Sequence, residues 1–111
     1  MSYSIVPTEK FKKEAKRLIK KYPSLQNELA AINKELSKDP TTGTSLGHDA
    51  FKIRVAIKSK GKGKSGGARI ITYLVTENKE VYLLTIYDKA EFDSIDDKSL
   101  KNMIKHLNVT K

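Results

Sequence analysis

The sequence of 111 residues contains no cysteine, which excludes disulfide bonds, thiolate metal sites and cysteine nucleophiles. It also lacks an apolar run long enough to span a bilayer, and the opening stretch MSYSIVPTEK has no apolar segment typical of a signal peptide. We therefore expect a soluble, cytoplasmic protein. The composition, 38% hydrophobic and 32% charged, is that of a globular chain, and the length predicts a single domain over residues 1–111.

Histidine is scarce, with only His48 and His106. His48 has no other histidine and no acidic cluster near it in the sequence, whereas metal sites need several such ligands. We therefore predict no metal site and no cofactor.

Acidic residues are absent from one long stretch, FKIRVAIKSKGKGKSGGARIITYLVT, which runs from Phe51 to Thr76. Its basic residues contribute +7 to a formal net charge of +9, and they are Lys52, Arg54, Lys58, Lys60, Lys62, Lys64 and Arg69. Concentrated positive charge attracts polyanions through the release of counterions. The expected partners are therefore nucleic acid or an acidic protein.

The same stretch has the pattern of a β-hairpin. Residues 51–58 alternate between apolar and polar side chains, and residues 68–76 are β-branched and aromatic, as strands require. Between them, residues 59–67 are only Gly, Ser and Lys, which indicates a loop. The hairpin would present its cations on one face and at its tip.

Two helices precede this hairpin, and a strand and a helix follow it. In chain order we expect a strand at 2–6, a helix beginning after Pro7, a second helix ending near Asp39-Pro40, a connection at 41–49, the hairpin, a strand at 81–87 and a C-terminal helix. Thr8 and Ser24 are the expected N-caps of the first two helices, and Ser94, Asp96 or Asp97 that of the last.

This order, β-α-α-β-β-β-α, predicts an α+β fold in which a helical hairpin packs on one face of a small antiparallel sheet. The other face would be partly open and would hold Lys52, Arg54 and Arg69. The first helix also carries seven basic residues opposite its apolar stripe. That basic face is either simply solvated or an addition to a nucleic-acid surface.

The element order, the pairing of FKIRVAI with ARIITYLV across a basic loop, and the YLLTIYDKAE segment resemble the RelE/HigB toxins of bacterial toxin–antitoxin pairs. The KSGGAR and LLTIYDKAEF stretches are most similar to the HigB-type branch. The resemblance covers nearly all of residues 3–107. It implies a ribosome-dependent mRNA endonuclease that inhibits translation and is itself silenced by an antitoxin, expected to be of the helix-turn-helix type.

The resemblance also implies candidate catalytic residues on the sheet, which by motif are Lys52, Arg54, Arg69 and Lys89. Arg54 and Arg69 suit contacts with the phosphate in the transition state, because clustered cations stabilise developing negative charge. A lysine whose pKa is lowered by like charges could transfer protons, so Lys52 is the candidate base and Lys89 the candidate acid. Glu91 is an alternative base.

The remaining basic residues of the hairpin are candidate RNA contacts, together with one tyrosine at a strand end; they are Lys58, Lys60, Lys62, Lys64 and Tyr87. In RelE-like proteins an arginine usually stands where this chain has Lys89, and a tyrosine where it has Ile95. Two other functions stay open: a ParE-like toxin that acts on a topoisomerase without cleaving RNA, and a basic RNA-binding module that is not toxic.

Overall fold

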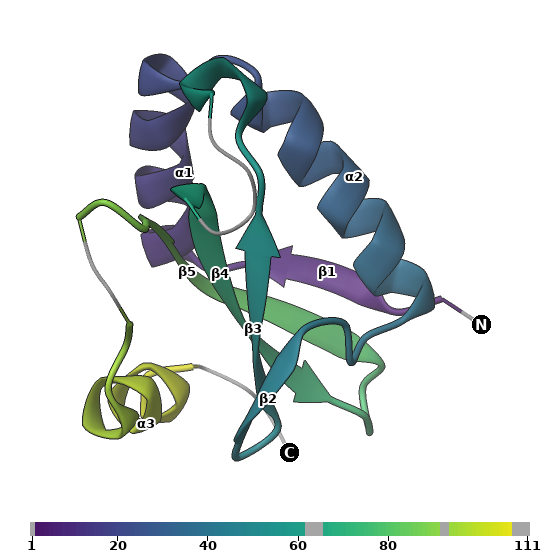
Figure 1. Cartoon of the computed structure of the whole chain (residues 1–111). Helices are drawn as coiled ribbons and strands as arrows, with labels where there is room; N and C mark the ends of the chain where they lie inside the picture. Colours follow the sequence, from purple (N-terminus) through teal and green to yellow (C-terminus); the bar gives the residue numbers. More distant parts are fainter. Residues whose placement is uncertain (1, 62–65, 92–93, 108–111) are drawn as a thin grey trace.

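The computed structural model describes residues 2–61, 66–91 and 94–107. Its elements, shown in Figure 1, are β1 (Ser4–Pro7), α1 (Glu9–Lys21), α2 (Leu25–Lys38), β2 (Thr44–Gly47), β3 (Ala50–Val55), the short 3-10 helix η1 (Lys58–Lys60), β4 (Ala68–Val75), β5 (Glu80–Asp88) and α3 (Asp97–Lys105). The predicted α+β fold and element order are confirmed, and β2 and η1 are additional. The longest helix has 14 residues, fewer than the roughly 20 that a bilayer span needs, and no helix in the described part of the chain could cross a membrane.

The predicted connection at 41–49 is wrong in part, because β2 lies within it and pairs antiparallel with β3. The turn between the two strands has positive φ angles at both His48 (55°) and Asp49 (62°), as a tight two-residue hairpin turn requires. The sequence gives little sign of this strand. Most of its side chains are exposed, so no alternation of apolar and polar residues marks it.

The sheet has the strand order β1-β5-β4-β3-β2. Strands β3 to β5 pair antiparallel, as predicted, and the additional β2 pairs antiparallel with β3, but β1 runs parallel to β5, so the sheet is mixed. A parallel pair needs a long crossover connection, and here the helices and the other strands lie between β1 and β5 in the chain. Beyond residue 83, β5 has no strand on its outer side among the described residues, and α1 runs there instead.

The N-cap residues of all three α-helices are among the predicted ones, and two of them cap through their side chains. Thr8 Oγ1 accepts a hydrogen bond from Phe11 N (3.2 Å), and the side chain of Asp96 caps α3 through Ser99 N (3.2 Å). Ser24 is the N-cap residue of α2, as predicted, but its side chain makes no capping hydrogen bond. Its hydroxyl instead lies 2.8 Å from that of Ser59 and fastens η1 to the start of α2.

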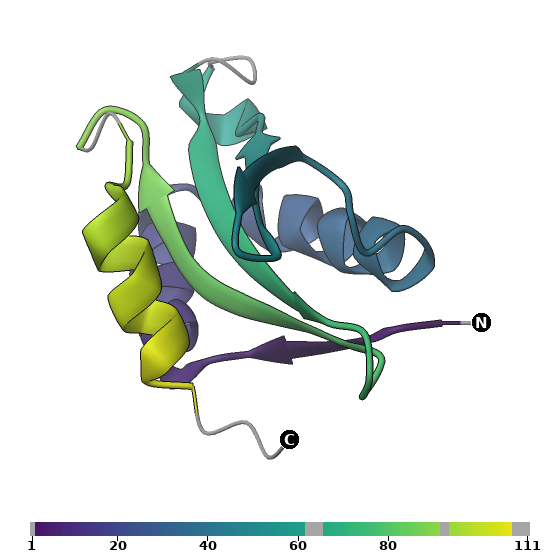
Figure 2. The same cartoon turned by 90° about the horizontal axis from the view of Figure 1, so that it is seen from below.

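Two apolar cores of different size lie on the two faces of the sheet. The larger core packs α1 and α2 against the sheet and includes Leu18, Leu36 and Ile70. The smaller core lies under α3 and includes Ile71 and Leu100. Figure 2 shows α2 and α3 on opposite sides of the sheet. The short α3 therefore covers the face on which we expected the cations.

Candidate nucleic-acid interface

The pairing of β3, β4 and β5 brings basic residues together across the sheet. Arg54 on β3 lies directly opposite Arg69 on β4, which in turn lies directly opposite Tyr87 on β5. Residues directly opposite each other project from the same face, and so does Lys52, two residues before Arg54. We call Lys52, Arg54 and Arg69 the cationic row.

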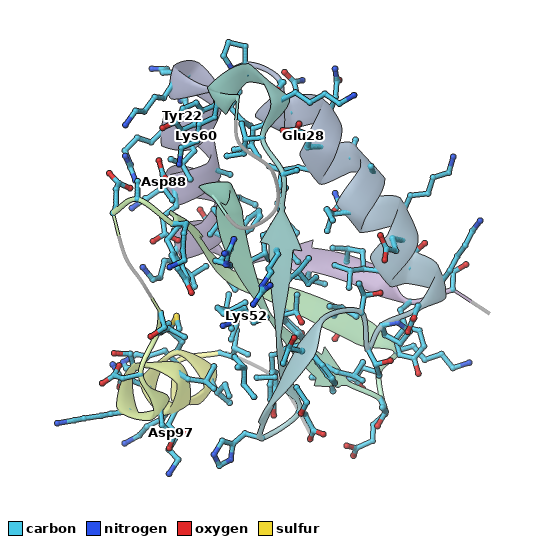
Figure 3. All side chains as sticks on the ribbon, viewed as in Figure 1. Tyr22, Glu28, Lys52, Lys60, Asp88 and Asp97 are labelled. Atoms are coloured by element: carbon cyan, nitrogen blue, oxygen red, sulfur yellow. The ribbon has the colours of Figure 1, made fainter. Side chains whose placement is uncertain are left out.

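The three cations of the row differ in exposure. Arg54 is exposed and Lys52 is half-buried, and Figure 3 shows Lys52 in the region between β3 and α3. Arg69 is only 3% exposed, and its Nη1 donates a hydrogen bond to the carbonyl oxygen of Ala68 (3.0 Å). Within the described ranges of the chain, no carboxylate lies within ion-pairing distance of Lys52 or Arg54.

Two arginines directly opposite each other are costly for a sheet, because like charges at this position repel. Guanidinium groups also remain charged at all physiological pH values, so the repulsion is not relieved by loss of a proton. The planar guanidinium group matches the geometry of phosphate oxygens. That Arg54 and Arg69 contact one phosphate stays a prediction.

The other candidate residues lie near one end of the row. Lys89 follows β5, and its backbone N–H donates to the carbonyl oxygen of Gly67 (3.0 Å), close to Arg69 in the sequence. Tyr87 is 6% exposed and packs in the smaller core. Lys58 has an exposed side chain on η1. The candidate RNA contacts Lys62 and Lys64 lie outside the described residues.

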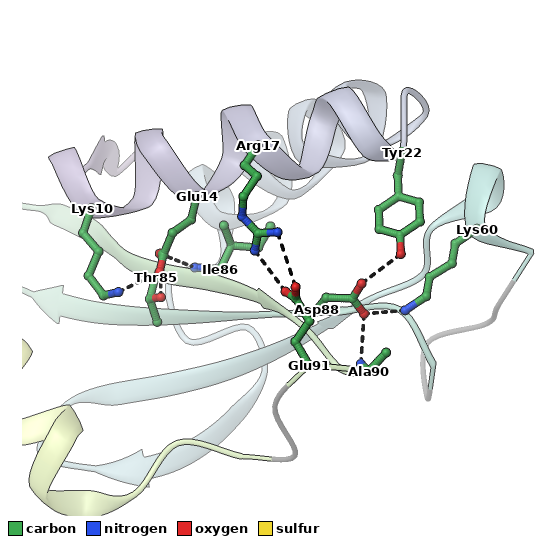
Figure 4. Close-up of polar contacts among 10 residues, drawn as sticks. All are labelled: Lys10, Glu14, Arg17, Tyr22, Lys60, Thr85, Ile86, Asp88, Ala90 and Glu91. Atoms are coloured by element: carbon green, nitrogen blue, oxygen red, sulfur yellow. Dashed lines mark hydrogen bonds and ion pairs between the residues drawn. The ribbon is translucent and has the colours of Figure 1, made fainter.

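Lys60 occupies a different environment from the row. Its ammonium forms an ion pair with Asp88, and the two side chains are only 11% and 1% exposed. Asp88 also accepts hydrogen bonds from the hydroxyl of Tyr22 (2.9 Å) and from Ala90 N (2.9 Å). Figure 4 shows this arrangement, which we call the Asp88 node: Asp88, Lys60, Tyr22 and Ala90. The structure thus gives Lys60 a partner within the protein.

The Asp88 node keeps its carboxylate charged despite burial. Burial alone would raise the pKa of Asp88, but the hydrogen bonds from Lys60, Ala90 and Tyr22 favour the ionised form. Their combined effect outweighs burial and holds the pKa of Asp88 below its usual value. The node therefore joins η1, the end of α1 and the end of β5 through a buried charge.

A second carboxylate with a structural role is Glu14 on α1. Its Oε1 accepts hydrogen bonds from Thr85 Oγ1 (2.6 Å) and from Ile86 N (3.3 Å), on the side of β5 that no strand covers. Its other oxygen pairs with Lys10 (2.6 Å). Glu14 thus supplies a hydrogen-bond acceptor to the uncovered edge of β5, which could otherwise pair with a strand of another chain.

The sequence did not predict that the carboxylates of Asp88 and Glu14 connect separate elements of the fold. Asp88 gives a weak signal, since a charge directly ends an apolar strand, but Glu14 gives none, because its partners are 71 and 72 residues away. Glu91, the alternative base, forms an exposed ion pair with Arg17 (3.0 Å). Across residues 2–61, 66–91 and 94–107, no three histidine, aspartate or glutamate side chains gather as metal ligands would.

Comparison with known proteins connects this geometry to one fold. No protein-family model matches the sequence. The structure is similar to that of a mutant of the E. coli toxin RelE in the free state, with a TM-score of 0.65 and 16% sequence identity, over 96% of this chain and 99% of that chain. The fold is RelE-like. At this identity the similarity concerns the fold alone, and membership of the HigB-type branch stays a prediction.

Proposed function

We propose that this chain is the toxin of a toxin–antitoxin pair and cleaves messenger RNA on the ribosome. The observation that carries the proposal is the direct opposition of the exposed Arg54 and the buried Arg69, on the face of the sheet against which α3 packs. The RelE-like fold supports it, since the solved structure with this architecture is described as a toxin. The excess of positive charge in the same segment supports RNA as the substrate.

The proposed reaction is an attack of the ribose 2′-oxygen on the adjacent phosphorus. Arg54 and Arg69 bind the phosphate and stabilise the negative charge that builds on its oxygens. Lys52, as a neutral amine, accepts the proton of the 2′-hydroxyl, and Lys89, as an ammonium, donates a proton to the 5′-oxygen as its bond to phosphorus breaks. The products are a 2′,3′-cyclic phosphate and a free 5′-hydroxyl. Lys58, Lys62 and Lys64 contact neighbouring parts of the RNA.

The proposal includes a protein antitoxin as partner. An acidic or amphipathic helix would neutralise the cationic row and block RNA at the same time. A short open reading frame for a helix-turn-helix protein beside the gene would support this part of the proposal. Deletion of that reading frame is expected to be tolerated only when the toxin gene is also inactive.

Expression of the chain from a repressible promoter, followed by mapping of cleavage sites in a defined message in a translation extract, tests the proposal. The chain contains three arginines, so Arg17, which lies on α1 away from the row, provides a matched control. We expect Arg69→Gln to abolish growth arrest and cleavage while the protein stays folded. We expect Arg17→Gln to retain both.

The same experiment separates the competing functions. Intact messages together with accumulating DNA breaks would favour a ParE-like toxin that acts on a topoisomerase. Salt-sensitive binding to RNA without growth arrest or cleavage would favour a non-toxic RNA-binding module. Full toxicity in a folded Arg69→Gln protein would refute the assignment of the cationic row.

A further inference from the structure

A groove of about 500 Å³ lies between α1 and α3, with part of β5 as its floor. The side chains that line it include Lys10 and Glu14 from α1, Thr85 and Tyr87 from β5, and Asn102 and Met103 from α3. Figure 4 shows Lys10 and Glu14 on α1 facing Thr85 on β5. The mechanism proposed above makes no use of this groove.

The groove adjoins the cationic row. Tyr87 lines the groove and also lies directly opposite Arg69, which lies directly opposite Arg54. Adjacent strands are about 4.8 Å apart, so the groove begins about one strand spacing from Arg69. A nucleotide whose phosphate lies on the row therefore has the groove within reach of its own base or of the next one.

The charge of the groove is opposite to that of the row. Its charged lining residues are Lys10, Glu14 and Asp96, so carboxylates outnumber ammonium groups, and the single ammonium already pairs with Glu14 (2.6 Å). The lining thus offers phosphate no unpaired ammonium group. It suits a neutral group whose N–H donors meet carboxylate and amide oxygens.

The rest of the lining favours a flat, apolar body. Met103 and Ile95 from the α3 side and the ring of Tyr87 supply apolar surface. Proteins that read single-stranded RNA take up unstacked bases on aromatic and apolar side chains and bind their edges with polar groups. The groove combines both kinds of surface beside a phosphate site.

We propose that this groove binds one unstacked nucleobase of the RNA strand whose phosphate lies on the cationic row. Adenine, cytosine and guanine carry an exocyclic amino group that donates to the carboxylate of Asp96, because both oxygens of Glu14 already have partners within the protein. Uracil lacks this group and turns carbonyl oxygens toward Asp96, so it binds more weakly. The inference rests on the proposed function, because it assumes RNA on the row, and it adds a base preference at one position.

Binding is measured by NMR on the full chain, titrated with millimolar AMP, CMP, GMP or UMP and with inorganic phosphate. We expect the three amino-bearing nucleotides to shift the methyl groups of Met103 and Thr85 and the side-chain amide of Asn102. UMP should bind about tenfold more weakly, the ratio expected from the loss of one base-edge contact. Inorganic phosphate should shift the arginine N–H signals of the row and leave the groove unchanged.

A pair of variants on α3 tests the location. Ser99 lines the groove and Lys98 does not, and both are exposed. Ser99→Phe should fill the groove and weaken the binding of AMP about tenfold or more, whereas Lys98→Phe adds the same ring outside it and should bind like the wild type. Equal effects of the two variants, or the same shifts with UMP as with AMP, would overturn the inference.

Mapping of cleavage in a translation extract separates this inference from the proposed function. Cleavage that depends on Arg69 but shows no preference against uracil near the cut, with no nucleotide shifts in the groove, overturns the base site and leaves the toxin function intact. Base-dependent shifts in the groove without any cleavage support the base site and count against the nuclease.

Discussion

Lys60 and Arg54 come from the same acid-free stretch of sequence, yet the fold places them in opposite environments. Lys60 is largely buried and pairs with Asp88, whereas Arg54 is exposed opposite a second arginine. The first cation is balanced by a charge of the protein, and the second has no carboxylate partner among the described residues. Lys60 therefore has a structural role, whereas Arg54 remains accessible to a ligand.

The largest effect is expected at the Asp88 node. Asp88→Asn leaves the buried ammonium of Lys60 without a counter-charge, and removal of one partner of a buried pair typically costs about 3–5 kcal/mol. Urea unfolding measures this loss. The double variant Asp88→Asn/Lys60→Met should recover part of it, since no buried charge remains. A loss below about 1 kcal/mol, the size typical of an exposed pair, would contradict the structural role of Lys60.

The next effect concerns chemistry on the row. Lys52→Gln removes the proposed base, and loss of a general base typically slows a reaction by about 10²-fold or more. Lys58→Gln, at an exposed position on η1, should change the single-turnover rate much less. The measurement is the cleavage rate of a ribosome-bound message over a range of pH. Equal cleavage rates in the two variants would show that Lys52 contributes no more to cleavage than an exposed lysine outside the row.

Gly67 tests the geometry of the row without changing any charge. A Cβ at this position would lie 1.9 Å from the carbonyl oxygen of Val55, so Gly67→Ala forces β3 and β4 apart where Arg54 meets Arg69. Such overpacking typically costs about 1–3 kcal/mol. We expect a lower free energy of unfolding, measured in urea, together with slower cleavage.

A second glycine provides the control for this change. A Cβ at Gly61 meets nothing within 4 Å, and only its positive φ of 74° opposes a side chain. Gly61→Ala should therefore lose about 1–2 kcal/mol of stability through backbone strain alone and cleave at the wild-type rate. Unchanged stability in the Gly67→Ala protein would show that the close approach to Val55 is absent in solution.

The pH dependence of stability should follow from the lowered pKa of Asp88. Because its folded pKa lies below its unfolded value, the stabilisation is complete above about pH 4 and is lost as the pH falls through the folded value. Protonation keeps the shape of the side chain, so we expect a smaller loss than in Asp88→Asn. Urea unfolding between pH 6 and pH 3 measures it. The slope below pH 4 should be shallower in Asp88→Asn, and an unchanged slope would contradict the assignment.

The smallest effect is expected at the exposed pair of Arg17 and Glu91. Both side chains remain accessible to water, at 53% and 36%, and exposed pairs contribute less than about 1 kcal/mol. Arg17→Gln should therefore shift the free energy of unfolding by less than this amount and leave cleavage unchanged. A clear loss of cleavage in Arg17→Gln would indicate that the functional surface includes α1.

Much of the fold could be predicted from the sequence because local signals agreed with tertiary packing. Thr8 begins α1, Asp96 begins α3, and the alternation around Ile53 marks β3. The parallel pairing of β1 with β5 could not be predicted, since it joins residues 76 positions apart and no local pattern encodes its direction. β2 was missed because its side chains are polar and exposed.

Only the part of the candidate site that follows from the pairing of neighbouring strands could be predicted from the sequence. The hairpin pattern was enough to place Arg54 and Arg69 on adjoining strands, and the structure adds that they are directly opposite. Lys60 is placed by its ion pair with Asp88, 28 residues away. Glu14 binds the edge of β5 that is uncovered because β1 ends. Such contacts follow from the packing of whole elements and leave no pattern in the local sequence.

The central claim is that Arg54 and Arg69 bind the same scissile phosphate, and a double-mutant cycle on the single-turnover cleavage rate tests it most directly. Each single change to glutamine should slow cleavage by about 10²-fold or more. Because both groups act on one phosphate, the double variant should be far faster than the product of the two losses predicts. Losses that multiply in a folded double variant, or single variants that cleave at the wild-type rate, would contradict the claim.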